Sequence, residues 1–142
     1  MYTKSNVNSA PLTRQRILVV DDDADSRELH RLVLRSYGAE ATAVDTALEA
    51  LSLMESQKFD ALVADIGLSG ASGYRLIRAV RARPAASGGR IPAIALTGYA
   101  TGQDRDHALD SGYDWHVAKP VDPGALVNAL VCVLAGKRMR DS

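Results

Sequence analysis

Short apolar runs alternate with segments of helical character along most of this chain. Strands are expected at about residues 16–20, 40–44, 61–65, 93–97 and 114–118, and helices at about 25–37, 46–54, 72–81, 103–111 and 123–134. Such an alternation in one short chain favours a parallel sheet with helices covering both of its faces. The pattern therefore predicts a single α/β domain.

The carboxyl ends of the strands carry the polar chemistry of the chain. The residues that follow the apolar runs are Asp21, Asp22 and Asp23, then Asp65, Thr97 and Lys119. In a flavodoxin-like (βα)5 doubly wound sheet, with strand order 2-1-3-4-5, the first and third strands are neighbours where a ligand crevice opens. We therefore expect that fold, with these side chains meeting at one edge of the sheet.

Capping residues and apolar spacing give the helices their expected starts and buried faces. The residues expected to begin helices are Asp25 or Ser26, Thr46, Ser72 and Asp122. Asp23 is interpreted as a peripheral charge. The side chains expected to be apolar contacts are Leu29, Leu32, Val33 and Tyr37 in the first helix, and Ala47, Leu48, Leu51 and Met54 in the second.

Composition indicates one domain without a global charge. The chain has 142 residues, of which 46% are hydrophobic, enough for a single core. Lys plus Arg and Asp plus Glu both number 17, so bulk charge gives no reason to expect nucleic acid or a membrane as a partner. No signal peptide or membrane span is expected, which favours a cytoplasmic location. Cys132 is the sole cysteine, so a disulfide framework is excluded.

Three segments are expected: a disordered leader at 1–15, the folded domain at 16–135, and a basic tail or linker at 136–142. The leader is polar and contains Pro11, whereas the tail carries Lys137, Arg138 and Arg140. The last helix is apolar almost all round from Ala125 to Leu134. It is therefore either deeply packed or a surface for a dimer or a docking partner.

Three carboxylates in one crevice require a cation. Like charges within a few ångströms repel one another, and a purely oxygen ligand set favours Mg²⁺ with several bound waters. With the cation present, one carboxylate can accept a phosphoryl group while Thr97 and Lys119 contact its oxygens. The interpretation of Asp21 to Asp23 as a simple helix cap is reasonable for any one of them, but not for the whole constellation.

These motifs together resemble the receiver domain of response regulators, the phosphoacceptor module of two-component signalling. The resemblance covers about residues 15–135, and the motifs that carry it are Ile17 to Asp22, Asp65, Ala95 to Gly98, and Ala118 to Pro120. The segments around Thr97 and Lys119 are similar to receivers attached to hybrid histidine kinases. The family implies a signalling module that is phosphorylated, rather than an enzyme with a separate substrate.

The resemblance assigns a role to each matching residue. It implies that Asp65 is phosphorylated, that Asp22 binds Mg²⁺ directly, and that Asp21 acts mostly through a metal-bound water. The backbone carbonyl of Gly67 is the further implied metal ligand.

The resemblance also implies a switch. Thr97 matches the hydroxyl that moves toward the phosphoryl group, Lys119 matches the cation that pairs with it, and the Lys119-Pro120 bond is expected to be cis.

Some positions depart from the family's usual pattern. The residue three before the lysine, commonly Tyr or Phe, is His116, which is interpreted as a half-exposed structural histidine or as a pH-sensitive switch. The other departures are Ser69, where Pro is common, and Gly67 and Tyr99, at positions that tune access of water to the acyl phosphate. The lifetime of the phosphorylated state is left open by these residues.

The implied mechanism is a population shift. Phosphorylation would repack the face formed by the helix at 103–111, the strand at 114–118 and the helix at 123–134, and that face would bind partners. The expected donor is a histidine kinase or a histidine phosphotransfer protein. No effector domain follows residue 136 in this sequence, so signalling by protein contact, passing on the phosphoryl group, and excision from a larger protein all stay open.

Two other interpretations use the same residues differently. A haloacid-dehalogenase-like phosphatase would use Asp21 as its nucleophile, but it leaves Asp65 unexplained. The glycines between Gly67 and Gly73 suggest a phosphate-binding loop, but their spacing fits neither the dinucleotide nor the P-loop pattern. Turn and helix-entry roles explain these glycines better.

Overall fold

The computed structural model describes residues 10–66, 70–98 and 102–141. Its strands are β1 (Arg16–Val20), β2 (Glu40–Val44), β3 (Ala61–Asp65), β4 (Ala93–Thr97) and β5 (Trp115–Ala118). Its α-helices are α2 (Ala24–Ser36), α3 (Ala47–Ser56), α4 (Gly70–Arg81), α5 (Gly102–Ser111) and α6 (Pro123–Leu134), and two short 3₁₀ helices are η1 (Ala85–Ser87) and η2 (Met139–Asp141).

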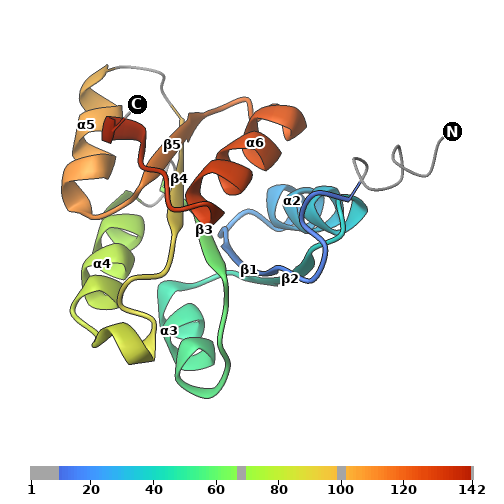
Figure 1. The fold of residues 1–142 in the computed structure, drawn as a ribbon. Helices are drawn as coiled ribbons and strands as arrows, with labels where there is room; N and C mark the ends of the chain where they lie inside the picture. Colours follow the sequence, from blue (N-terminus) through green and yellow to red (C-terminus); the bar gives the residue numbers. More distant parts are fainter. Residues whose placement is uncertain (1–9, 67–69, 99–101, 142) are drawn as a thin grey trace, which may run out of the picture.

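The strands form one parallel sheet in the order β2-β1-β3-β4-β5, which confirms the predicted α/β fold (Figure 1). The register aligns the carboxyl ends: Val20 lies opposite both Val44 and Ala64, and Thr97 lies opposite Ala118. The polar residues that follow the strands are therefore brought to one edge of the sheet.

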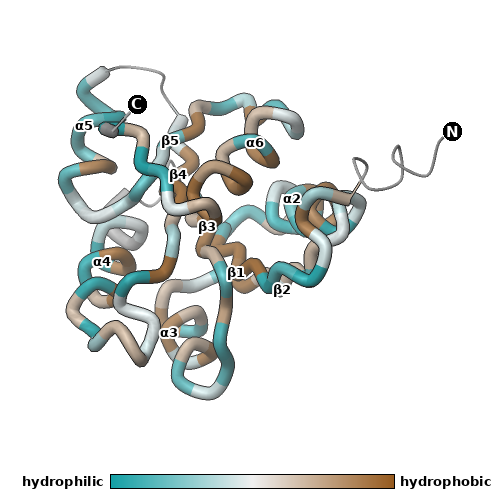
Figure 2. The backbone as a smooth tube through the Cα atoms, in the orientation of Figure 1, coloured by the Kyte–Doolittle hydropathy of each residue, from teal (hydrophilic) through white to brown (hydrophobic). Residues whose placement is uncertain are grey.

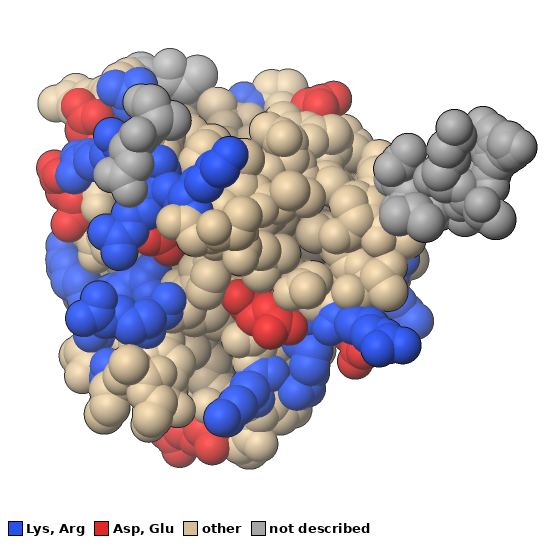
Figure 3. Space-filling view, in the orientation of Figure 1, with Lys and Arg blue, Asp and Glu red and all other residues tan. Residues whose placement is uncertain are grey.

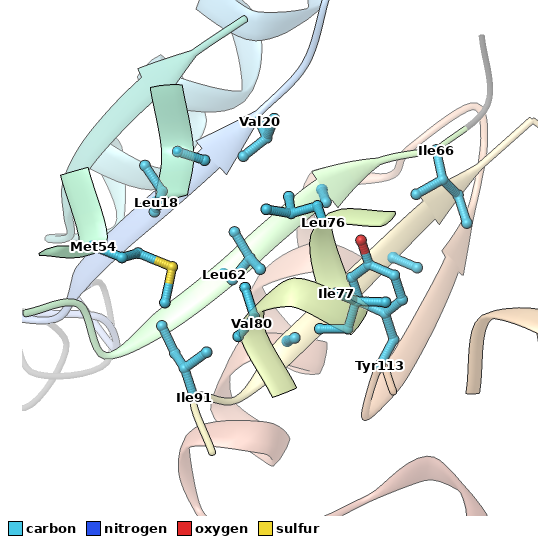
Figure 4. Packing of buried hydrophobic residues seen from close by; sticks show 14 of the residues in the cluster. Leu18, Val20, Met54, Leu62, Ile66, Leu76, Ile77, Val80, Ile91 and Tyr113 are labelled. Atoms are coloured by element: carbon cyan, nitrogen blue, oxygen red, sulfur yellow. The ribbon is translucent and has the colours of Figure 1, made fainter. Parts of the chain in front are cut away.

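Helices cover the two faces of the sheet and bury two apolar clusters. On one face α3, α4 and α5 pack over strand side chains that include Leu18 and Leu62, and Figure 4 shows Ile77 of α4 in this cluster. On the other face α2 and α6 pack over Ile17, Val63 and others. Because the central strands are buried on both faces, they are apolar between their ends, as the brown central strands of Figure 2 show.

Helix α2 is where the sequence prediction was wrong in detail. Its N-cap is Asp23, whose side chain accepts from the backbone N–H of Ser26, so Asp23 is not a peripheral charge and Asp25 is not the cap. Leu29 and Leu32 are 59% and 52% exposed. The helix instead buries a pair of residues on its inner side, His30 and Leu34.

Helices α3 and α4 also differ in part from the prediction. Thr46 is the N-cap of α3, as predicted, and its hydroxyl accepts from the N–H of Glu49. Leu48 is 79% exposed, and the buried residues of α3 are Ala50 and Met54. Helix α4 begins at Gly70, before the predicted cap Ser72. Helical spacing identified these helices but did not decide which of two apolar sides faces the sheet.

Both ends of the described chain pack against the domain. Leu12 is fully buried, and its N–H donates to the carbonyl of Tyr37, so the packed part of the chain begins before residue 16. At the other end the N–H of Met139 donates to the carbonyl of Asp114. In the described part of the chain, no helix combines the length and apolar character needed to cross a membrane.

Candidate functional site

A cavity of about 260 Å³ opens at the carboxyl edge of the sheet. Asp21 and Asp22 line it from the end of β1, and Asp65 lines it from the end of β3. The three predicted carboxylates are thus brought together. Asp45 and Thr46, from the end of β2, and Gly73, from α4, also line the cavity.

Asp21 is held in place by groups of its own segment. Its side chain accepts from the backbone N–H of Asp23 at 3.0 Å and from the hydroxyl of Ser26 at 2.6 Å, and His30 Nδ1 lies 3.5 Å from its Oδ2. Burial raises the pKa of Asp21, but contacts with His30, Ser26 and the Asp23 N–H outweigh it and lower the pKa to about 2. Asp21 is therefore an ionised, oriented carboxylate.

Asp65 pairs with Lys119 across β4. Lys119 Nζ donates to Asp65 Oδ2, and the side chain of Asp65 is 1% exposed whereas that of Lys119 is 26% exposed. The Lys119-Pro120 bond is cis, as the family resemblance implied. The pair places a partly exposed ammonium group beside a buried carboxylate, which suits binding of an anion that replaces or extends the carboxylate.

Thr97 lies at the end of β4, between the acidic cavity and β5. It is 4% exposed, and its Oγ1 is 2.5 Å from Nε2 of His116, which is half-buried on β5. Burial and the charge of Arg105 lower the pKa of His116, and Asp104 opposes them. The predicted switch hydroxyl is therefore bonded to the residue that departs most from the family pattern.

Sequence reasoning missed the contributions of β2 and α4. Asp45 directly follows β2, so the rule that identified Asp21 and Asp65 could also have found it. Gly73 carries no such signal along the chain. A Cβ on Gly73 would lie 1.8 Å from Cγ2 of Ile66, so only glycine lets α4 approach the end of β3 this closely.

The donor chemistry of the cavity fits a hard divalent cation. Asp21, Asp22 and Asp65 offer only oxygen ligands, and their negative charges face one small space. Among the residues that the structure describes, no three acidic, histidine or cysteine side chains form a ready-made metal cluster. The predicted ligand Gly67 lies outside the described residues.

Taken together, the parallel fold and its carboxyl edge place acids around one cavity, with a lysine and a threonine beside them. The response regulator receiver domain model matches residues 17–131. The chain therefore belongs to the response regulator receiver domain family, as its motifs predicted.

Individual relatives agree with this membership. An uncharacterized 14.6 kDa protein of Leptolyngbya boryana is 46% identical over 116 residues, which cover 82% of this chain and 87% of that protein. The receiver domain of a sensor histidine kinase from Pseudomonas aeruginosa, solved with a magnesium ion in its active site cleft, is 32% identical with a TM-score of 0.75. The similarity covers 88% of this chain and all of that one (100%).

The similarity extends to a receiver within a much larger protein. Hybrid signal transduction histidine kinase I of Dictyostelium discoideum is 29% identical over 134 residues, which cover 89% of this chain but 8% of the kinase. This agrees with the predicted similarity to receivers of hybrid kinases. The family match favours the receiver over the phosphatase with Asp21 as nucleophile.

Proposed function

We propose that the chain is a phosphoacceptor of a two-component or phosphorelay system, and that Asp65 accepts the phosphoryl group from a phosphohistidine in a Mg²⁺-dependent reaction. The observation that carries the proposal is the position of Asp65, a buried carboxylate that lines the acidic cavity and pairs with Lys119. One Asp65 oxygen attacks the phosphorus, the bond from phosphorus to the histidine nitrogen breaks, and that nitrogen leaves with the electron pair.

Asp22, Asp65, the backbone of Gly67 and, through water, Asp21 are the groups proposed to hold Mg²⁺. When bound, the cation neutralises the charge that gathers on the phosphoryl oxygens. Asp21 is already ionised and fixed by Ser26 and the Asp23 N–H, so it needs little rearrangement to take this role. Lys119 stays beside Asp65 and pairs with the new charge.

The output surface is proposed to be formed by α5, β5 and α6. Phosphorylation adds about two negative charges beside Thr97 and Lys119, at the ends of β4 and β5. Movement of these two residues would shift the strand and helices that follow them, and thereby the population of an active form. On α6 most apolar side chains are buried and Val131 is 42% exposed, so a homodimer or effector contact there would centre on that side of the helix.

The proposed donor is a histidine kinase or a histidine phosphotransfer protein. An apolar cavity of about 360 Å³ lies beside Lys119, and Leu29, Val33 and Leu126 help to line it. A donor helix that seats an apolar side chain there would have its histidine near the Asp65–Lys119 pair. The cytoplasmic location stays a prediction, as do the boundaries of the leader and tail.

The proposal is tested by intact-mass spectrometry after incubation with acetyl phosphate, with Mg²⁺ or with EDTA. We expect one phosphoryl adduct on the wild type with Mg²⁺, none with EDTA, and none on Asp65→Asn. An adduct that survives Asp65→Asn but is lost in Asp21→Asn would instead support the phosphatase. No adduct on the wild type would contradict phosphoacceptor function.

A further inference from the structure

The hydroxyl of Thr97 is bonded to a side chain that can either accept or donate a proton. On the paired strands β4 and β5, Ala95 lies opposite His116 and Thr97 lies opposite Ala118, so Thr97 and His116 are diagonal neighbours on one face of the sheet. Their Oγ1 and Nε2 atoms are 2.5 Å apart. The direction of this hydrogen bond depends on which nitrogen of His116 carries a proton.

That direction decides what Thr97 can offer to a phosphoryl group. A threonine hydroxyl has one proton to donate and two lone pairs. If His116 Nε2 accepts, the only proton of Thr97 points at the histidine. A phosphoryl oxygen can only accept a hydrogen bond, so it would then face a lone pair of Thr97 and form no bond with it. If His116 Nε2–H donates, Thr97 accepts from the histidine and its own proton is available to the phosphoryl group.

We propose that His116 is a positioning residue for the phosphorylated state, whose Nε2–H donates to Thr97 Oγ1 and so directs the hydroxyl proton of Thr97 at the phosphoryl group on Asp65. The inference rests on the proposed function, because it assigns a role in stabilising the acyl phosphate. His116 forms no covalent bond in it. The proton on Nε2 comes from solvent, when the imidazole ring becomes protonated.

The surroundings of His116 make this bond sensitive to pH. From α5, Arg105 disfavours its protonation and Asp104 favours it; from β4, its polar neighbour is Thr97. Asp114 and Lys119 flank β5 at its two ends, and α6 packs with Val117 on the other face. Burial and Arg105 lower the pKa of His116 before phosphorylation, so the ring is mostly neutral at pH 7.

A phosphoryl group on Asp65 would favour the protonated form of His116. Its charge of about −2 favours a protonated His116 across the shared Thr97, so phosphorylation takes up a proton. By linkage, lowering the pH then stabilises the phosphorylated state, and the gain is complete below the pKa that His116 has before phosphorylation. The stabilisation gained at low pH equals the factor by which the phosphoryl group strengthens proton binding to His116.

The test is the affinity for beryllofluoride, a stable mimic of the phosphoryl group, measured with Mg²⁺ between pH 5.5 and 8. The chain has one tryptophan, Trp115, next to His116, whose fluorescence can report binding. Wild type is compared with His116→Phe, which removes the bond, and with His116→Gln, whose amide N–H can donate at every pH. The matched control is His107→Gln, because His107 lies on α5 and its ring stacks on that of Tyr74 from α4.

We expect the ratio of wild-type affinity to His116→Phe affinity to rise about tenfold from pH 8 to pH 5.5. His116→Gln should bind more tightly than His116→Phe by a factor that does not vary with pH, and His107→Gln should follow the wild type. In a Thr97→Ala background, His116→Phe should cause no further loss. If His116 had only a structural role, His116→Phe would still lower the affinity in the Thr97→Ala background.

Two results separate failure of this inference from failure of the proposed function. If the wild type binds beryllofluoride and is phosphorylated on Asp65, but His116→Phe has the same pH profile, the positioning role is overturned and the receiver function stands. If the wild type neither binds beryllofluoride nor gains an Asp65-dependent adduct, the proposed function is overturned, and the inference with it.

Discussion

Two ion pairs, one at each edge of the sheet, have similar charges but different surroundings. Lys119 and Asp65 pair at the carboxyl edge, and Arg81 and Asp114 pair at the amino ends of β4 and β5. Each pair joins residues far apart in the sequence, and each is partly buried. They differ in the kind of cation and in the groups that surround it.

The amino-edge pair is fixed from several sides. The Arg81 guanidinium also donates to the carbonyls of Gly112, Gly89 and Ile91, and Asp114 also accepts from the N–H of Ala93. Burial lowers the pKa of Arg81, and Asp114 opposes that effect. These bonds use four of the five guanidinium N–H donors of Arg81, so we interpret the network as structural.

The surface around the amino-edge pair is strongly basic. Arg90, Arg138 and Arg140 line the same cavity as Arg81, and Figure 3 shows Lys and Arg side chains gathered on the side of the molecule near the C-terminal segment. Arg140 pairs with Asp110 and Arg138 lies 3.7 Å from Asp114, so these charges are largely matched by acids. They tie the end of the chain to α5 and β5.

The geometry of the carboxyl-edge pair allows the lysine to change its partner from a carboxylate to a phosphoryl group. Lys119 Nζ donates to Asp65 Oδ2 beside a cavity that further acids line. An ammonium group on a flexible stem can follow a carboxylate that gains a phosphoryl group, whereas a guanidinium fixed to three carbonyls cannot. The phosphoacceptor role that we propose for Asp65 therefore falls in the pair whose cation is a flexible ammonium group.

The largest effect we expect is that of Asp65→Asn, which should abolish phosphorylation while changing the free energy of unfolding by no more than about 1 kcal/mol. Removing this charge relieves repulsion from Asp21 and Asp22, which offsets the lost contact with Lys119. Phosphoryl incorporation from acetyl phosphate and urea denaturation measure the two quantities. The amide oxygen is not nucleophilic enough to replace the carboxylate, so residual incorporation would mean another acceptor.

Lys119→Met should slow phosphorylation by about 100-fold, because one donor to the developing phosphoryl charge is lost. The protein should stay folded, since the lysine is partly exposed. Initial rates of adduct formation, with Lys119→Arg as the charge-preserving control, measure this effect. An unchanged rate in Lys119→Met would remove Lys119 from the site.

Arg81→Met should lower stability and leave phosphorylation unchanged, the opposite of Lys119→Met. We expect it to lower the free energy of unfolding by about 2 kcal/mol, because Asp114 and several carbonyls lose their donor. The rate of phosphorylation should not change under conditions where the variant is folded. Arg90→Met, at an exposed arginine that lines the same cavity, is the matched control and should alter neither quantity.

Ser26→Ala should lower the free energy of unfolding by about 1 kcal/mol at pH 7, through loss of the hydroxyl bond to Asp21. The pKa of Asp21 is lowered from 3.8 to about 2, so its stabilising contribution is present above about pH 4 and is lost as the pH falls toward 2. The difference between variant and wild type should shrink over that range. Ser36→Ala, which removes an exposed hydroxyl bond in the same helix, should show no such pH dependence.

The sequence was sufficient for the sheet and for most of the site because both depend on local runs. A parallel strand buried on two faces is apolar throughout, so its end and the polar residue after it stand out, as at Asp21 and Asp65. The order of the strands then follows from few allowed topologies.

The errors arose where tertiary contacts decide between local alternatives. In α2 several apolar residues lie on both sides, and packing buries His30 with Leu34 while Leu29 and Leu32 face outward. Among Asp23, Asp25 and Ser26, the backbone at Asp23 selects the cap. The bond between Thr97 and His116 depends on strand register, which no local pattern encodes.

The central claim is that Asp65, in the exchangeable pair, is the acceptor. It is tested most directly by reducing the acyl phosphate of the wild-type protein with borohydride after incubation with acetyl phosphate and Mg²⁺, and identifying the modified residue by peptide mass spectrometry. We expect the reduced residue, homoserine, at position 65 alone. Homoserine at position 21 or 22, with none at 65, would contradict the account.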